Sequence, residues 1–168
     1  WSVNYVSDLS GRIPTWGFAG SAFIDGDRVI VQPGGENGAS VVALDRLTGK
    51  TIWSSLDDEA GYATPMIVEH AAHRQLIVWT PSHIRGIDPR NGQPNWEVPY
   101  KITYGVAITE PIFEQGHVIV CGYWDGSKAI RLGQQPRDAE LAWEENKFLR
   151  GLMSQPLYRD GHVYLLDK

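Results

Sequence analysis

The chain contains few of the residues that would define its chemistry or its compartment. A single cysteine, Cys121, in 168 residues excludes an internal disulfide, and its place in an apolar run predicts a buried thiol. No apolar run approaches the roughly 18 residues that a membrane span requires. No stretch shows sustained helical periodicity. Because 20 acidic residues outnumber 15 basic ones, the net charge is −5, which argues against a nucleic acid or an anionic membrane as partner.

Glycine, proline and tryptophan, by contrast, are plentiful, and one sequence motif occurs twice. Residues 43–53 read Ala-x-Asp-x-x-Thr-Gly-Lys-x-x-Trp, and residues 86–96 repeat this pattern with Gly for Ala, Asn for Thr and Gln for Lys. The motif tryptophan recurs as Trp53, Trp96 and Trp143, at intervals of 43 and 47 residues. A period in the forties indicates four-stranded units, each of which must stack on a copy of itself to bury its face.

Each position of the motif has a predicted structural role. The carboxylate of Asp45 or Asp88 is expected to accept hydrogen bonds from its own turn, while Gly49 or Gly92 supplies the left-handed residue. The tryptophans are expected to lie buried between adjacent units. The third unit lacks the Asp and the Thr-Gly and keeps only its tryptophan. The predicted docking motif comprises Ala43, Asp45, Thr48, Gly49, Trp53, Gly86, Asp88, Gly92, Trp96 and Trp143.

The units consist of short apolar runs separated by turn residues, which predicts strands throughout. Asp25-Gly26, Gln115-Gly116 and Asp160-Gly161 predict tight hairpins, whereas residues 69–75 predict a longer turn in the second unit. Blade ends are expected near residues 6, 56, 99 and 146. Residues 1–4 resemble the closing strand of a preceding unit, and residues 162–168 the second strand of a following one. We therefore expect residues 1–168 to be part of one domain, truncated at both termini.

The motif resembles the tryptophan-docking repeat of the PQQ-repeat, or quinoprotein-like, β-propeller family, and in particular its exported bacterial members. That family includes quinoprotein alcohol dehydrogenases and a non-catalytic lipoprotein that helps to assemble outer-membrane β-barrels. The resemblance implies an all-β, incomplete β-propeller of four-stranded antiparallel blades, with three full blades and partial blades at both ends. It also implies a periplasmic or otherwise exported protein.

Candidate chemistry is sparse. His70 and His73 have no third ligand at a suitable spacing, and the acidic run at residues 57–59 is read as a solvated loop rather than a calcium site. No catalytic set can be assembled by spacing. The quinoprotein enzymes hold their quinone against adjacent cysteines and bind calcium, and this chain has no adjacent cysteine pair. We therefore expect no cofactor, and PQQ with calcium only under the alternative function.

In a propeller, the loops between blades share a face with the loops between second and third strands. Here both sets carry aromatic and polar residues, which suit a site for a protein or a small molecule. The candidate binding face comprises Trp16, Tyr62, His83, Tyr104, Trp124 and Arg150. The sequence thus predicts a non-catalytic propeller scaffold or ligand-binding and protein-binding module in an exported bacterial protein. The alternative is part of a PQQ-dependent alcohol or sugar dehydrogenase.

Overall fold

The computed structural model describes residues 1–166, and these form three four-stranded antiparallel sheets followed by a two-stranded one. The first sheet contains β1 (Phe23–Asp25), β2 (Arg28–Val31), β3 (Val41–Asp45) and β4 (Thr51–Ser55). The second contains β5 (Met66–His70), β6 (His73–Trp79), β7 (His83–Ile87) and β8 (Pro94–Pro99). The third contains β9 (Ile112–Glu114), β10 (His117–Gly122), β11 (Gly126–Leu132) and β12 (Ala139–Glu145). The last contains β13 (Leu157–Arg159) and β14 (His162–Tyr164). Residues 167 and 168, which the sequence assigned to the final strand, lie outside the described residues.

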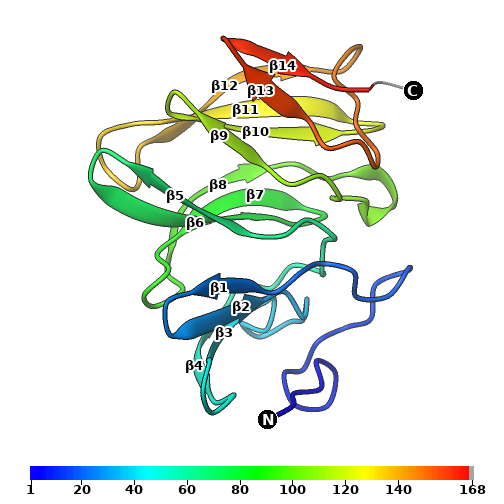
Figure 1. Cartoon of the computed structure of the whole chain (residues 1–168). Helices are drawn as coiled ribbons and strands as arrows, with labels where there is room; N and C mark the ends of the chain where they lie inside the picture. The colour runs from blue at the N-terminus through cyan, green and yellow to red at the C-terminus, as the bar shows by residue number, and fades with distance from the viewer. Residues whose placement is uncertain (167–168) are drawn as a thin grey trace.

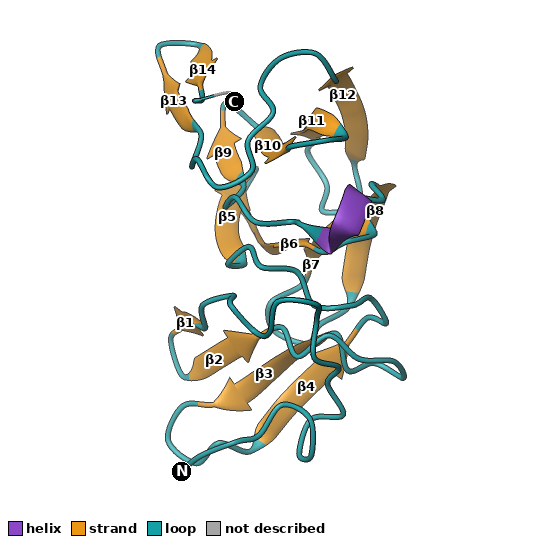
Figure 2. Cartoon of the chain, turned by 90° about the vertical axis from the view of Figure 1, so that its right-hand side faces the viewer, coloured by secondary structure: helices purple, strands orange, loops and turns teal. Residues whose placement is uncertain are grey.

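The sheets follow one another like the blades of a propeller (Figure 1). Within each full sheet the strands are ordered as they occur in the chain. The first strands β1, β5, β9 and β13 lie along one side of the molecule, and the fourth strands lie along the other (Figure 2). The only helix among residues 1–166 is a single 3-10 turn, η1 (Thr103–Gly105). This arrangement confirms the all-β class, and over residues 1–166 the blades form an open arc.

The N-terminal segment differs from the prediction. Residues 1–4 form no strand, and within residues 1–166 no strand pairs with them. Instead, the side chain of Asn4 accepts hydrogen bonds from the backbone N–H groups of Val6 and Ser7, at 2.9 and 3.1 Å, and folds the segment into a turn. Trp1 nevertheless reaches the first sheet, where its indole N–H donates to the carbonyl of Arg46 at 3.0 Å.

The hairpin turns follow the predicted chemistry with one exception. Gly26, Gly116 and Gly161 adopt positive φ angles of 60°, 75° and 81°, as tight hairpins require. The longer turn expected at residues 69–75 is wrong. His70 pairs directly with His73, so Ala71 and Ala72 alone form a two-residue turn, with φ angles of 48° and 62°. Alanine at a left-handed position is uncommon, so the residue types gave no sign of this turn.

The hydrophobic core lies between the sheets. A small cluster joins the first sheet to the second through Ile30, Val41, Trp53, Leu76 and other residues. A larger cluster joins the second sheet to the third. It includes Trp79 and Tyr100, whose rings are stacked 5.8 Å apart with an interplanar angle of 7°. Each sheet therefore buries its apolar face against a neighbouring copy, as a repeat architecture requires.

Candidate functional site

The two repeated turns share one backbone pattern, in which the glycine N–H donates to the carbonyl of the aspartate at 2.8 Å, but their carboxylates bind different partners. The Oδ1 atom of Asp45 accepts hydrogen bonds from the backbone N–H and hydroxyl of Thr48, both at 2.7 Å, which lowers the pKa of its carboxyl group. In the second turn Asp88 binds the backbone N–H and the guanidinium of Arg90, and these bonds likewise lower its pKa. Gly49 and Gly92 have φ angles of 73° and 75°. Each turn presents a backbone carbonyl group and a glycine, which has no side chain, to the preceding segment of the chain.

Tryptophans occupy both of these surfaces. The buried indole of Trp53 donates to the carbonyl of Pro89 in the second sheet, with an Nε1–O distance of 3.1 Å. A Cβ atom on Gly92 would lie 2.6 Å from the Trp53 ring, so only glycine fits there. Trp1 lies on Gly49 in the same way. Trp53 thus joins the first sheet to the second, and Trp1 holds the N-terminal segment against the first sheet.

The third unit departs from this pattern. Its turn carries no Asp–Gly pair, and Asp138 closes it instead by accepting a hydrogen bond from the N–H of Gln135 at 3.1 Å. Trp96 is buried, but its N–H donates within its own sheet, to Oε1 of the buried Gln75 at 2.8 Å. Trp143 is 37% exposed, so the prediction that it is buried is wrong. No neighbouring motif turn lies against it among the described residues.

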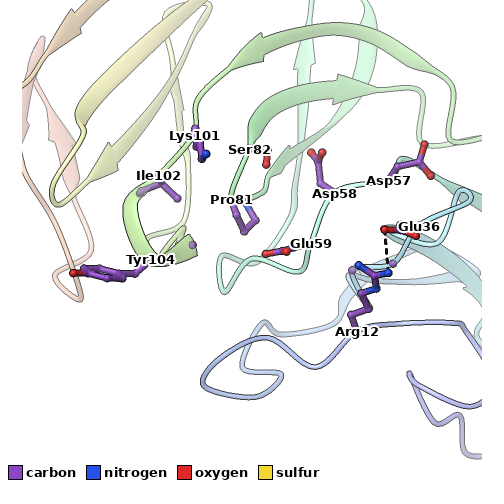
Figure 3. A pocket seen from close by; sticks show the side chains of 13 residues that line it. Arg12, Glu36, Asp57, Asp58, Glu59, Pro81, Ser82, Lys101, Ile102 and Tyr104 are labelled. Atoms are coloured by element: carbon purple, nitrogen blue, oxygen red, sulfur yellow. Dashed lines mark ion pairs between the residues drawn. The ribbon is translucent and has the colours of Figure 1, made fainter.

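A hollow of about 430 Å³ opens on the face formed by the inter-sheet loops and the loops between second and third strands (Figure 3). We call the surface formed by these two sets of loops the loop face. Five loop segments contribute to the hollow: Arg12, residues 34–36, 57–59 and 81–82, and residues 101–105. Its lining residues are Arg12, Gly34, Gly35, Glu36, Asp57, Asp58, Glu59, Pro81, Ser82, Lys101, Ile102, Tyr104 and Gly105.

Asp58 anchors the floor of the hollow. Its carboxylate accepts hydrogen bonds from the hydroxyl of Thr80 at 2.6 Å and from Arg85, and it lies 3.0 Å from Nδ1 of His83. Burial alone would raise the pKa of Asp58, but the Thr80 hydrogen bond, the charge of Arg85 and the His83 contact outweigh burial and lower it. The expectation of a solvated acidic loop is therefore wrong for Asp58, whose side chain is 10% exposed.

An aromatic patch adjoins the hollow. Tyr104 and Trp124 are 70% and 45% exposed, and their rings meet edge to face with centroids 5.2 Å apart. Tyr123 packs against Trp124 at 4.6 Å. The patch is fixed by Asp125, whose carboxylate accepts a 2.6 Å hydrogen bond from the backbone N–H of Thr103. Tyr104 itself has a left-handed backbone with a φ angle of 59°.

The predicted binding residues do not form one site. Tyr104 lines the hollow, and Trp124 contacts Tyr104. His83 contacts Asp58, which lines the hollow. Trp16 and Tyr62 form a separate pair with centroids 6.1 Å apart, and Arg150 is not among the lining residues. Arg12 and Lys101 were not singled out from the sequence, because their convergence depends on how separate loops meet. The signals that pointed to this region were Tyr104, in the predicted binding face, and the acidic run after Trp53.

Within residues 1–166, no three histidine, cysteine or acidic side chains converge in a way that could hold a metal ion. Cys121 is the only cysteine of the chain, and burial raises the pKa of its thiol. Among the same residues, no helix is long and apolar enough to cross a membrane.

Three stacked four-stranded antiparallel sheets, the first two joined by the Trp53 indole, define a β-propeller of repeated blades. Residues 12–168 match the model of the family described as outer membrane protein assembly factor BamB, and the chain belongs to that family. It is similar in fold to the crystal structure of BamB from Moraxella catarrhalis, with a TM-score of 0.57 and 19% sequence identity. The match covers 89% of this chain and 43% of that one, so the chain spans less than half the length of that structure. No curated protein matches the sequence.

Proposed function

We propose that this protein is a non-catalytic propeller scaffold that binds a protein partner through its loop face, as part of an exported bacterial protein. The observation that carries the proposal is the exposed Tyr104–Trp124 pair beside the hollow. Exposed aromatic side chains are the residue type most enriched at the centres of protein interfaces.

The backbone of the loop face supports this proposal because it is already ordered. The N–H groups of Tyr62 and Ala63 both donate to the carbonyl of Ala107 at 2.8 Å, which ties two inter-sheet loops together. The N–H of Ile102 donates to the carbonyl of Pro81 at 2.9 Å and ties an inter-sheet loop to a loop within a sheet. A preorganised surface loses little conformational entropy on binding, so more of its contact energy is retained as affinity.

The family description supports both the proposed role and the proposed compartment. It names an outer membrane protein assembly factor, a role that consists of contacts with other proteins at the outer membrane. We extend that role to this chain as a periplasmic or otherwise exported binding module.

Site-specific photo-crosslinking tests the proposal in the source bacterium. A benzoylphenylalanine at Trp124 should give a discrete crosslinked product, whereas the same probe at Leu47, which is exposed in a turn of the first sheet away from the loop face, should give none. Tyr104→Ser should reduce the product from position 124. Equal products from both positions, or none from position 124, would contradict the proposal.

The enzymatic alternative, a PQQ-dependent alcohol or sugar dehydrogenase, predicts a different result. Titration with PQQ and calcium would then show stoichiometric uptake of the quinone by absorbance, followed by dye-linked alcohol oxidation. We expect neither. Uptake with turnover would overturn the non-catalytic assignment.

A further inference from the structure

We propose that the loop face recognises an extended peptide segment in which a basic side chain lies next to an apolar or aromatic one. The basic side chain enters the hollow, and the apolar neighbour packs on the aromatic patch formed by Tyr104, Tyr123 and Trp124. This inference rests on the proposed protein-binding function and names the chemistry of the partner.

Some of the charged residues that line the hollow form ion pairs, and others do not. Glu36 forms an ion pair with Arg12 at 3.0 Å, and Asp58 is paired with Arg85. Asp57 and Glu59 are exposed, and neither forms an ion pair among residues 1–166. They face a single further lining cation, Lys101, so the hollow carries an excess of negative charge. A cationic side chain complements this surface and an acidic one is repelled.

The fold holds the Asp57 carboxylate in place. The Oδ1 atom of Asp57 accepts a 2.6 Å hydrogen bond from the backbone N–H of Gly38, and the next residue, Asp58, is anchored on the second sheet. Opposite them, Gly34 lies so close to Ala60 that any side chain would collide with its backbone. The hollow is therefore a preformed cavity, and a cation that enters it does not need to reorganise the loops.

The aromatic patch sets the second requirement. Tyr104 both lines the hollow and contacts Trp124, so the two features adjoin at this residue. Figure 3 shows Tyr104 at the edge of the hollow, with its ring directed away from the other labelled residues. The exposed rings offer apolar area to a neighbouring side chain and a face to the cation itself, which aromatic rings attract through their quadrupole. A glycan would also stack on such rings, and its hydroxyl groups can donate hydrogen bonds to the carboxylates, but a neutral sugar brings no positive charge to balance them. The charge complementarity therefore favours a basic peptide.

Fluorescence anisotropy with labelled peptides tests this inference. The probe alternates arginine and phenylalanine, one control replaces arginine with glutamate, and another replaces phenylalanine with serine. We expect each control to bind at least about tenfold more weakly. Raising the salt concentration should weaken binding of the arginine–phenylalanine peptide. The ratio between its affinity and that of the serine control should not change, because that ratio reflects apolar contact and not charge.

Protein variants locate the binding site. Glu59→Gln combined with Asp57→Asn should weaken binding about three- to tenfold and reduce its salt dependence, and Tyr104→Ser should weaken it by a similar factor. Glu114→Gln, which removes an exposed charge from the β9–β10 hairpin, is the matched control and should have no effect. Thermal unfolding of each variant checks that the fold is intact.

The outcomes separate the two proposals. Discrete crosslinking from position 124, with no preference for the arginine–phenylalanine peptide, would keep the binding function and overturn the basic-peptide assignment. Equal binding of the peptide to wild type and to the Glu59→Gln, Asp57→Asn and Tyr104→Ser variants would also overturn it. Tighter binding of a neutral glycan oligomer than of the peptide would assign the surface to sugars instead.

Discussion

The interface between the first and second sheets and the interface between the second and third are joined in different ways. At the first, the indole of Trp53 leaves its own sheet and bonds to the turn of the next one. At the second, Trp96 stays within its own sheet and bonds to Gln75. The difference follows from the receiving turn, because the turn at residues 133–138 has no glycine with a positive φ and no Asp-x-x-Thr-Gly pattern.

The substitution of glycine for alanine in the second motif fits this difference. Ala43 lies opposite Trp53 in the first sheet, and Gly86 lies opposite Trp96 in the second. Because Gly86 has no side chain, the Trp96 indole can lie over β7 and reach Gln75 on β6. The larger apolar cluster, with its stacked Trp79 and Tyr100, takes over the contact with the third sheet. One repeat position thus supports two ways of joining blades.

Removing either indole should produce the largest effect. Trp53→Ala and Trp96→Ala should each lower the free energy of unfolding by roughly 3–5 kcal/mol, as expected for deleting a large buried aromatic side chain. Trp96→Phe sharpens the comparison, because it leaves the buried Gln75 carbonyl without its main donor, at a cost of about 1–3 kcal/mol.

Urea denaturation with a double-mutant cycle measures these terms. Adding Gln75→Met should restore part of the free energy of unfolding that Trp96→Phe removes. It should not change the free energy of unfolding that Trp53→Phe removes. Equal behaviour in both backgrounds would mean that the two interfaces are joined alike.

Asp58 provides a second link across the first interface. Asp58→Asn should lower the free energy of unfolding by about 2–3 kcal/mol at neutral pH, because it leaves the buried Arg85 without its closest carboxylate. The folded-state pKa of Asp58 is lowered, so its contribution is complete above its unfolded pKa of about 4 and is lost as the pH falls through the lower folded value. The difference between wild type and variant should therefore shrink in urea titrations below about pH 4. Asp27→Asn, at an exposed carboxylate, should show little change at any pH; a similar loss there would refute the assignment to the buried pair.

Gly92 tests whether the motif turn receives the indole. Gly92→Ala should cost about 2–3 kcal/mol, since it combines a left-handed backbone with contact to the Trp53 ring. Gly161→Ala is the matched control, because its φ is 81° and nothing lies within 4 Å of the added atom, so only about 1 kcal/mol of backbone strain is expected. In a Trp53→Ala background, calorimetric melting should show that Gly92→Ala lowers the stability by little more than Gly161→Ala does. If Gly92→Ala still lowers the stability by much more, ring contact is not the cause.

Features that depend on neighbouring residues in the chain could be predicted from the sequence, and features that depend on separate segments could not. The paired strands, the Asp45 turn and the left-handed glycines follow from local patterns. The burial of Asp58 depends on Thr80 and Arg85, which approach it only when the second blade is in place. The loss of the strand at residues 1–4 and the exposure of Trp143 have the same origin, since each would need a partner segment beside it.

The cross-sheet ion pair should contribute least. Arg74 in the second sheet binds Asp25 in the first at 2.7 Å, but its side chain is 51% exposed. Arg74→Met should therefore lower the free energy of unfolding by only about 0.5 kcal/mol, and this loss should decrease further at high salt because ions screen exposed pairs. Arg131→Met, which removes an exposed pair with Glu140 inside the third sheet, is the control and should behave alike. Urea denaturation at low and high salt makes the measurement. A loss above about 2 kcal/mol for Arg74→Met alone would show that charge pairing, and not the docked indole, dominates the first interface.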